Sequence, residues 1–302
     1  MTATQTQSAR SYYGRPIIKE PVWEWEIPLY FFTGGLAGAS ATLGLVADVA
    51  GNKPLARSAW TAAFAGITVS PALLVADLGK PTRFINMLRM FKITSPMSVG
   101  SWILTAASGT FTAAFARARL GRLNRIGAVS GVLGGVLGPA LSTYTAVLVA
   151  DTAIPAWHEA RNQLPFVFAG SSMASAGGAA CILTPVAHAG PARRLAIAGA
   201  VVEGAASQVM ERHLGALGRP YHEGASGRFA LAAKSLTVAG AAVIARRGHG
   251  RAGAVAGGLL LLAGSVCERF TVYHAGFQSA RDPEATVGPQ RERAAAAGRP
   301  SP

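Results

Sequence analysis

Long apolar runs, separated by short loops that hold most of the charged residues, constrain this chain more than any other feature. Half of its 302 residues are apolar and only 14% are charged, whereas a typical soluble domain carries about 25% charged residues. A helix needs roughly 20 apolar residues to cross the hydrocarbon core of a bilayer, and the runs have about that length. The first 26 residues are polar, and no cleavable signal peptide is expected before the first run. The pattern predicts an all-α integral membrane protein.

Eight transmembrane helices are expected, arranged as two four-helix bundles. Strands are not indicated, because a membrane β-barrel would show alternating segments of about ten residues. The expected parts are a polar amino-terminal tail (1–26), a first membrane half (27–151), a second membrane half (152–274) and a polar carboxyl-terminal tail (275–302). The predicted spans are Ile27–Ala50, Ala59–Leu78, Val99–Ala116, Ile126–Ala150, Leu164–Val186, Leu195–Val209, Phe229–Ala245 and Ala252–Tyr273.

The net charge of +14 is explained by membrane topology rather than by binding to nucleic acid. Basic residues crowd short loops between spans, where topology and lipid headgroups favour them. The loops after the first, third, fifth and seventh spans carry more arginine and lysine than the opposite loops. This bias favours an amino terminus outside the cell, but counting the basic residues of the tails reverses it. We expect a multi-pass protein of the cell membrane, with both orientations open.

The stretch from Asp77 to Trp102 concentrates residue types that are typical of function. An apolar run ends at the carboxylate of Asp77, and a Gly-Lys-Pro turn leads to Arg83. A short basic segment with an apolar face follows, and such a segment lies flat in the membrane interface. An acidic residue at the mouth of a lipid-embedded helix is costly and usually functional. An ion pair of Asp77 with Lys80 or Arg83 is the structural alternative.

Further polar and aromatic residues reach the same membrane face if the spans alternate in direction. Trp25 and Glu26 precede the first span, and Tyr30 lies one turn inside it. Trp102 opens the third span, and Tyr144 lies about two turns before the end of the fourth. Interfacial tryptophan and tyrosine are commonly membrane anchors. The convergence of the whole set with Asp77 on one face favours a binding site.

Haem and metal sites are not expected in this chain. Haem in membrane proteins is commonly held by axial histidines, whereas the six histidines here fall in loops or at span ends. Neither C-x-x-C nor H-E-x-x-H occurs, and both are typical of metal or redox sites. Cys181 and Cys267 lie within apolar runs, as ordinary buried thiols do.

Two ionisable residues fall inside predicted spans of the second half. Glu203 lies in the sixth span and Lys234 in the seventh, at similar depth in neighbouring helices. Such residues usually face the bundle interior and pair with one another. A buried ion pair of Glu203 with Lys234 is one interpretation, and a proton path that includes Glu211 and Glu268 is the other.

Several strings of the first half, taken together, resemble the NrfD / polysulfide reductase membrane-subunit family. The strings are W-E-W-E-I-P-L-Y-F-F-T-G-G-L-A-G from Trp23, D-L-G-K-P-T-R-F from Asp77, S-P-M-S-V-G-S-W from Ser95 and Y-T-A-V-L-V-A-D-T-A-I-P-A-W from Tyr144. The resemblance implies a haem-free membrane anchor that binds quinone, either menaquinone or ubiquinone. It also implies two partners, an iron–sulfur (ferredoxin-like) subunit docked on the membrane face and a molybdopterin-type catalytic subunit. The chain would pass electrons between the iron–sulfur subunit and the quinone pool, without activity of its own.

The positions that match the quinone contacts of the family are Ile27, Tyr30 and Tyr144. Ile27 is apolar where a relative has an amide, and Tyr30 stands where that relative has a histidine, so the quinone type stays open. The expected quinone-binding residues are Trp25, Ile27, Tyr30, Trp102 and Tyr144, and the expected proton relay is Glu26, Asp77 and Arg83.

Two other functions remain as alternatives. A secondary transporter would explain Glu203, Lys234 and the helix interruptions at Pro71 and Pro139, but the two halves show no inverted repeat of hydropathy. A purely structural anchor would only tether a partner. The sequence names neither the substrate of the catalytic partner nor the direction of quinone chemistry.

Overall fold

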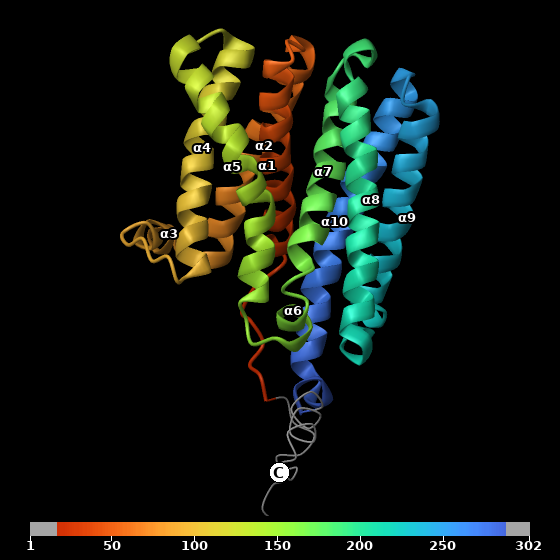
Figure 1. Cartoon of the computed structure of the whole chain (residues 1–302). Coiled ribbons are helices and arrows are strands. Elements are labelled where there is room, and N and C mark those ends of the chain that lie inside the picture. The colour runs from red at the N-terminus through yellow and green to blue at the C-terminus, as the bar shows by residue number, and fades with distance from the viewer. Residues whose placement is uncertain (1–16, 288–302) are drawn as a thin grey trace, which may run out of the picture.

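The structure, a computed structural model of the whole chain, describes residues 17–287. Its long helices run side by side along one axis, with their ends gathered at two opposite faces (Figure 1). The elements are α1 (Glu26–Val49), α2 (Lys53–Leu78), α3 (Pro81–Met87), α4 (Pro96–Leu120), α5 (Asn124–Ala150), α6 (Pro155–Glu159), α7 (Leu164–Leu183), the 3₁₀ turn η1 (Val186–His188), α8 (Gly190–Leu214), η2 (Gly215–Tyr221), α9 (Gly224–Arg247) and α10 (Arg251–Arg281).

The two ends of the molecule differ in charge. We call the end that carries the α1–α2, α4–α5, α7–α8 and α9–α10 connections the basic face. Its basic residues are Lys53, Arg57, Arg122, Arg125, Arg193, Arg194, Arg246, Arg247 and Arg251. The opposite end, where α1 begins and α10 ends, is the amino-terminal face (Figure 1).

Local sequence signals explain where the helices of the first half begin and end. The Asn52 side chain accepts a hydrogen bond from the backbone N–H of Leu55 at 3.3 Å, and Ser95 caps α4 in the same way. A proline follows each cap, at a position where the missing N–H costs nothing. Gly79 and Gly121 end the same two helices with φ of 68° and 63°, a region that glycine adopts without strain.

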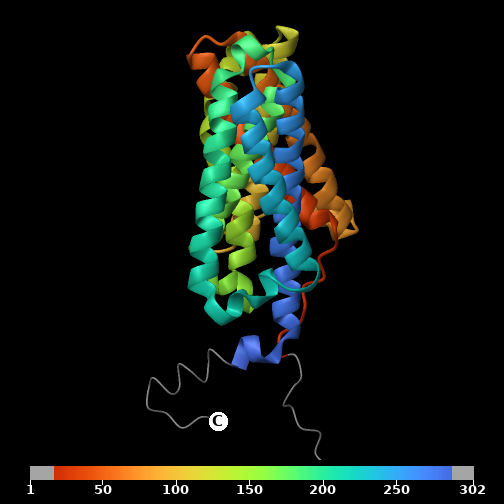
Figure 2. The same ribbon diagram turned by 90° about the vertical axis from the view of Figure 1, so that its right-hand side faces the viewer.

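The long helices pack in two neighbouring sets. In the first set, α1 packs against α2 and α5, and α4 packs against α2 and α5. In the second, α7 packs against α8 and α10, and α9 packs against α10. Helix α7 also contacts α1 and α5, so it joins the two sets. Figure 2 shows α8, α9 and α10 side by side on the flank that they form.

The structure confirms the all-α membrane class, with seven apolar helices that are long enough to cross a bilayer within the described residues. These are α1, α2, α4, α5, α7, α9 and α10, so the chain is a multi-pass membrane protein. The remaining predicted span, the sixth (Leu195–Val209), corresponds to α8, whose 25 residues extend about 37 Å. Helix α8 contains Arg193, Arg194, Glu203 and Glu211 and is therefore less apolar than the others.

The predicted boundary of the carboxyl-terminal tail at residue 275 is wrong. Helix α10 continues to Arg281, and its last turns pack inward rather than extend into solvent. Gly276 lies against the ring of Trp157, and the Phe277 ring meets the same indole at 6.3 Å. This late apolar contact extends the helix beyond the predicted span.

The basic segment after Asp77 is helical only over Pro81–Met87, the helix α3, which projects sideways from the other helices (Figure 1). The chain then returns to α4 without a long helix. Large apolar side chains are exposed along it, at Ile85, Met90, Phe91 and Ile93. Such exposure, next to Arg89 and Lys92, is typical of a segment that lies in the headgroup region of a membrane.

Candidate functional site

Two tyrosines from different helices meet inside the first set of helices. Tyr30 lies one turn into α1 and Tyr144 near the end of α5, and the Tyr30 hydroxyl donates to the Tyr144 hydroxyl at 3.3 Å. Only 1% of Tyr30 and 9% of Tyr144 is exposed. The ring of Tyr144 lies against Gly100 of α4, where any Cβ atom would overlap the ring. A hydroxyl has one donor position, so Tyr144 keeps an O–H that it can donate to a bound molecule.

Three carboxylates gather at the amino-terminal face, where α1 begins and α2 ends. An Asp77 carboxylate oxygen accepts a hydrogen bond from the backbone N–H of Glu24 at 3.1 Å. The carboxylates of Glu24 and Glu26 lie close enough to act electrostatically on Asp77. One oxygen of Glu26 is buried and has no hydrogen-bond partner among residues 17–287. Carboxylates placed in this way can accept and release protons at the mouth of the helices.

Arg83 caps α2 instead of pairing with Asp77. Its guanidinium donates to the carbonyl oxygen of Leu78 at 2.8 Å, at the end of a helix, where carbonyls lack helical partners. No ion pair within 4.0 Å joins Asp77 to Lys80 or Arg83 in the described part of the chain. Arg83 therefore stabilises the turn after α2.

The remaining predicted quinone-site residues lie in three different environments. Ile27 is 4% exposed and belongs to the same core as Tyr30. Trp25 is 57% exposed at the amino-terminal face. Trp102 is 41% exposed, and its indole N–H donates to the carbonyl of Met90 at 3.4 Å, which fastens the loop after α3 to α4. Of these three residues, Ile27 is buried close to the tyrosine pair, and the two tryptophans line the surface.

The segment before α1 is held against the end of α10. The Tyr273 hydroxyl donates to the backbone carbonyl of Trp23 at 2.6 Å, and the Trp23 and Trp157 rings stack at 5.6 Å. Arg281 donates two hydrogen bonds to the carboxylate of Glu20, both at 2.8 Å. The Arg281 guanidinium holds the pKa of Glu20 below its usual range. Residues from both ends of the chain thus build the amino-terminal face.

A second group of ionisable residues is buried between α7, α8 and α10. Arg269 is 0% exposed and donates to the Phe168 carbonyl at 3.0 Å and to the Ser172 hydroxyl at 3.1 Å. Its guanidinium carbon lies 3.8 Å from the centre of the Phe168 ring, a distance typical of a cation–π interaction. Glu203 and Glu268 are 5% and 7% exposed and lie close enough to interact electrostatically with Arg269. These two residues are the acidic neighbours of the buried guanidinium.

The expected ion pair of Glu203 with Lys234 does not form. Lys234 is exposed on α9, whereas Glu203 faces the interior, and no ion pair within 4.0 Å joins the two residues. The buried positions of α9 are Ser226, Ala233, Thr237, Gly240 and Ile244. The rotation of a helix by about 100° per residue turns Lys234 off that face. The basic neighbour of Glu203 is Arg269.

Two residues that organise these sites are absent from the sequence-based candidates. Arg269 follows Glu268 directly, and an adjacent acid and base near the middle of the last apolar run were the available signal. Tyr273 lies one turn further on, and it looks like an ordinary interfacial tyrosine in the sequence. Its role depends on contact with Trp23, 250 residues earlier.

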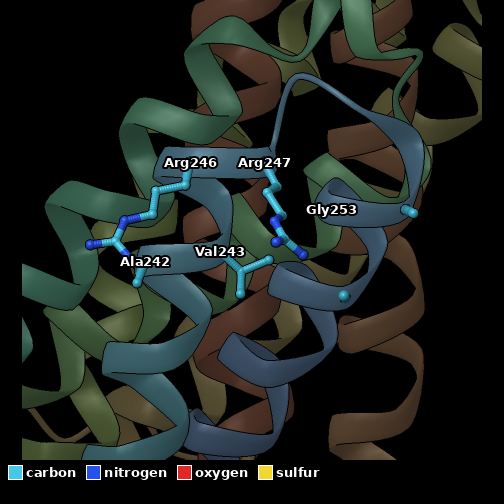
Figure 3. A pocket seen from close by; sticks show the side chains of 7 residues that line it. Ala242, Val243, Arg246, Arg247 and Gly253 are labelled. Carbon is cyan, nitrogen blue, oxygen red and sulfur yellow. The ribbon is translucent and has the colours of Figure 1, made fainter.

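A pocket lies at the basic face, at the opposite end of α10 from Tyr273. It is bounded by the end of α9 and the start of α10 and has a volume of about 440 Å³. Figure 3 shows Arg246 and Arg247 extending to opposite sides of the helix end beside it. Within residues 17–287, no three His, Cys, Asp or Glu side chains come together as metal ligands.

The comparison with protein families identifies the chain. The family model described as "Polysulphide reductase, NrfD" matches residues 17–203, which is more than half of the 302 residues. The match covers the tyrosine pair, the carboxylates of the amino-terminal face and Glu203. No curated protein matches the chain. The chain therefore belongs to the NrfD polysulphide reductase family, whose members are membrane subunits that partner with oxidoreductase subunits.

Proposed function

We propose that this chain is the quinone-binding membrane subunit of an iron–sulfur/molybdopterin oxidoreductase of the cell membrane. It passes electrons between a docked iron–sulfur subunit and the membrane quinone pool. The observation that carries the proposal is the buried hydrogen bond between Tyr30 and Tyr144, one helical turn below a cluster of carboxylates. Membership of the family supports the same role.

The residues present fit a quinone head group. A quinone is an apolar ring with two carbonyl acceptors, and it needs an apolar slot with a few donors. Tyr144 retains a free O–H, while Ile27 and Phe31, both buried, supply apolar walls. The bound quinone supplies the two-electron redox chemistry, since the chain carries no redox group of its own in this proposal.

Each residue then has a defined task. Tyr144 donates a hydrogen bond to a quinone carbonyl, and Tyr30 fixes the orientation of the Tyr144 hydroxyl. Asp77 and Glu26 exchange protons with solvent at the amino-terminal face, because quinone reduction or quinol oxidation moves two protons with the electrons. Trp25 and Trp102 anchor this face in the membrane interface. Arg83 holds the turn that carries Asp77.

The proposed membrane topology has eight spans in two four-helix bundles. Within residues 17–287, seven helices are apolar enough to span, and α8 runs beside α7 over much of its length (Figure 1). Glu203 of α8 is buried in the interior, and a membrane helix can carry an acidic residue that faces the protein rather than the lipid. With α8 included, the start of α1 and the end of α10 lie on the same side.

The test compares electron transfer to quinone with electron transfer to a soluble dye in the intact complex. Tyr144→Phe removes one hydrogen bond, worth about 0.5–1.5 kcal/mol, and is expected to lower quinone-linked turnover about three- to tenfold. Asp77→Asn keeps the shape but removes the proton carrier, so we expect a larger loss. Dye reduction at the catalytic subunit should stay unchanged.

Tyr221→Phe is the matched control, because Tyr221 is also buried (3% exposed) but lies in η2, outside the tyrosine pair. It should leave both activities unchanged. Unaltered quinone-linked activity and inhibitor sensitivity in Tyr144→Phe and Asp77→Asn would place the quinone elsewhere. A complex that retains full quinone activity without this chain would leave only the structural-anchor function.

A further inference from the structure

A groove between the two sets of helices opens toward the basic face. It is bounded by α1, α5, α7 and α8 and has a volume of about 480 Å³. The residues that define it include Leu43, Val46, Pro139, Met173, Leu195 and Arg194. None of its lining residues belongs to the tyrosine pair or the carboxylate cluster, so the groove is separate from the proposed quinone site.

The side chains in the interior of the groove offer no free hydrogen-bond donor. Three hydroxyls line it, and each is directed to a backbone carbonyl of its own or a neighbouring helix. Thr42 donates toward Gly135 at 3.0 Å and Ser142 toward Gly138 at 2.9 Å. Thr143 donates to Pro139 at 2.9 Å. The depth of the groove is therefore suited to hydrocarbon rather than to a polar head group.

A single charged side chain, Arg194, lines the groove. Arg194 lies in the first turns of α8, where the helix dipole also favours an anion. Its guanidinium is exposed and has no hydrogen-bond partner among the described residues. The neighbouring Arg193 is already engaged, since it donates to the carbonyls of Val186 and Gly248. Arg194 is thus the cation available to a ligand.

From this combination we infer that the groove binds an anionic phospholipid, with an acyl chain between the two helix sets and the phosphate on Arg194. A long hydrocarbon chain fits the apolar interior, and a charged head fits the cation at the mouth. A quinone ring fits less well, because its carbonyls would find no donor in the depth. The lipid would fill the seam between the two sets and join them. The inference does not depend on the proposed function.

The experiment measures lipid binding to the delipidated protein in mild detergent. Thermal stability and native mass spectrometry are followed as phosphatidylglycerol or phosphatidylcholine is added. We expect phosphatidylglycerol to bind and to raise the melting temperature more than phosphatidylcholine. Arg194→Gln should weaken phosphatidylglycerol binding about tenfold, as expected for one charge-assisted contact. It should weaken phosphatidylcholine binding less, because the choline cation already compensates the phosphate charge, so the preference for phosphatidylglycerol is lost.

Three variants and a phosphate titration distinguish a lipid-binding site in the groove from general attraction of anions to the basic face. Ala198→Trp fills the groove and should remove phosphatidylglycerol binding although every charge is kept, whereas Arg194→Lys should retain most of it. Arg122→Gln, an exposed arginine of the same face outside the groove, is the matched control and should behave as wild type. Inorganic phosphate alone should have no effect.

The inference would be overturned if the two lipids bound and raised the melting temperature equally. It would also be overturned if Arg194→Gln kept the wild-type preference for phosphatidylglycerol. A shift produced by inorganic phosphate alone would show a simple anion site without the acyl seat. Competition by a quinone analogue that Ala198→Trp abolishes would assign the groove to quinone instead.

Discussion

At the scale of single residues, the candidate site depends on partners that are distant in sequence. Tyr30 and Tyr144 are separated by 114 positions and share one hydrogen bond. Tyr273 reaches Trp23 across 250 positions. The sequence identifies the residue types and their depth, because each lies near the end of an apolar run. It does not identify which side of a helix each residue faces.

Gly100 decides how closely Tyr144 can lie against α4. Any Cβ at this position would overlap the Tyr144 ring, so Gly100→Ala should destabilise the protein by about 1–3 kcal/mol, as overpacking usually does. It should also lower quinone-linked turnover by displacing the tyrosine. Thermal unfolding and the quinone assay measure the two effects. Gly109→Ala, in the same helix with open space around it, is the control, and an equal loss in both variants would contradict the prediction.

The contrast between Lys234 and Arg269 shows what the sequence-based prediction lacked. The prediction matched charges by depth, which Lys234 satisfies, and ignored the face of the helix, which Lys234 does not. The buried spacing of Ala233, Thr237 and Gly240 already excludes Lys234 from the interior of α9. To identify Arg269 as the basic neighbour of Glu203, one must also know that α10 packs more closely on α7 than α9 does.

The buried charges of Glu203 and Arg269 should be coupled. Glu203 and Arg269 interact electrostatically although no ion pair within 4.0 Å joins them among the described residues. Leaving one buried charge without its compensating neighbour costs up to about 3–5 kcal/mol. Glu203→Gln and Arg269→Met should each lower the thermal stability strongly, and the double variant should cost less than the sum. Lys234→Met is the control and should change stability by less than about 0.5 kcal/mol. Additive losses would show that the two charges act independently.

At the scale of elements, run length was sufficient to predict the long helices. Each predicted span corresponds to a long helix of the described residues, and seven of these helices are apolar enough to cross a bilayer. About 20 apolar residues in lipid must satisfy their own backbone hydrogen bonds, and a helix does so. The errors lie at ends that tertiary contact decides. Helix α10 gains its last turns from Trp157, and α3 stops after seven residues. Such ends depend on the neighbouring element rather than on local sequence.

Helices α7 and α8 pack with their backbones in contact. A Cβ at Gly199 of α8 would meet the backbone of Ala174 in α7, and small residues of this kind allow close helix contact in membranes. Gly199→Ala should therefore separate the two helices and cost about 1–3 kcal/mol of stability. Gly204→Ala, just over one turn further along α8 with no neighbour within 4 Å, should be neutral or slightly stabilising. Equal melting temperatures for the two variants would contradict this packing.

At the scale of the whole molecule, the segment before α1 and the last turns of α10 meet at the amino-terminal face. The Glu20–Arg281 ion pair and the Tyr273–Trp23 hydrogen bond hold the segment before α1. This face also carries Asp77 and Glu26, so the segment lies beside the proposed site. The sequence placed both ends on one side through an even number of spans, but it could not predict their contact.

The attachment of residues 17–25 to the end of α10, through the Glu20–Arg281 ion pair, should depend on pH. Arg281 lowers the pKa of Glu20, so the ion pair is complete above the ordinary glutamate pKa of about 4.3 and is lost as the pH falls through the lowered value. Hydrogen exchange of residues 17–25, corrected for its intrinsic pH dependence, should show protection that falls only below that value. Arg281→Gln should reduce protection at neutral pH.

Arg228→Gln removes another exposed arginine near the same face and serves as the control for this experiment. It should leave exchange of the segment unchanged at every pH. If hydrogen exchange of residues 17–25 is the same in Arg281→Gln and Arg228→Gln, the ion pair does not hold the segment.

The proposed eight-span topology places the two ends of α8 on opposite sides of the membrane. His188 before α8 and Glu223 after it are both exposed, so each can be replaced by cysteine in a variant whose native Cys181 and Cys267 are alanine. A membrane-impermeant maleimide should label His188→Cys and Glu223→Cys from opposite sides of the membrane. One of the two variants should react in right-side-out vesicles and the other in inverted vesicles. Arg161→Cys, in the connection between α6 and α7, should follow Glu223→Cys, because two crossings separate them. Labelling of positions 188 and 223 from the same side would mean that α8 does not cross, and that its charged residues lie along the membrane surface instead.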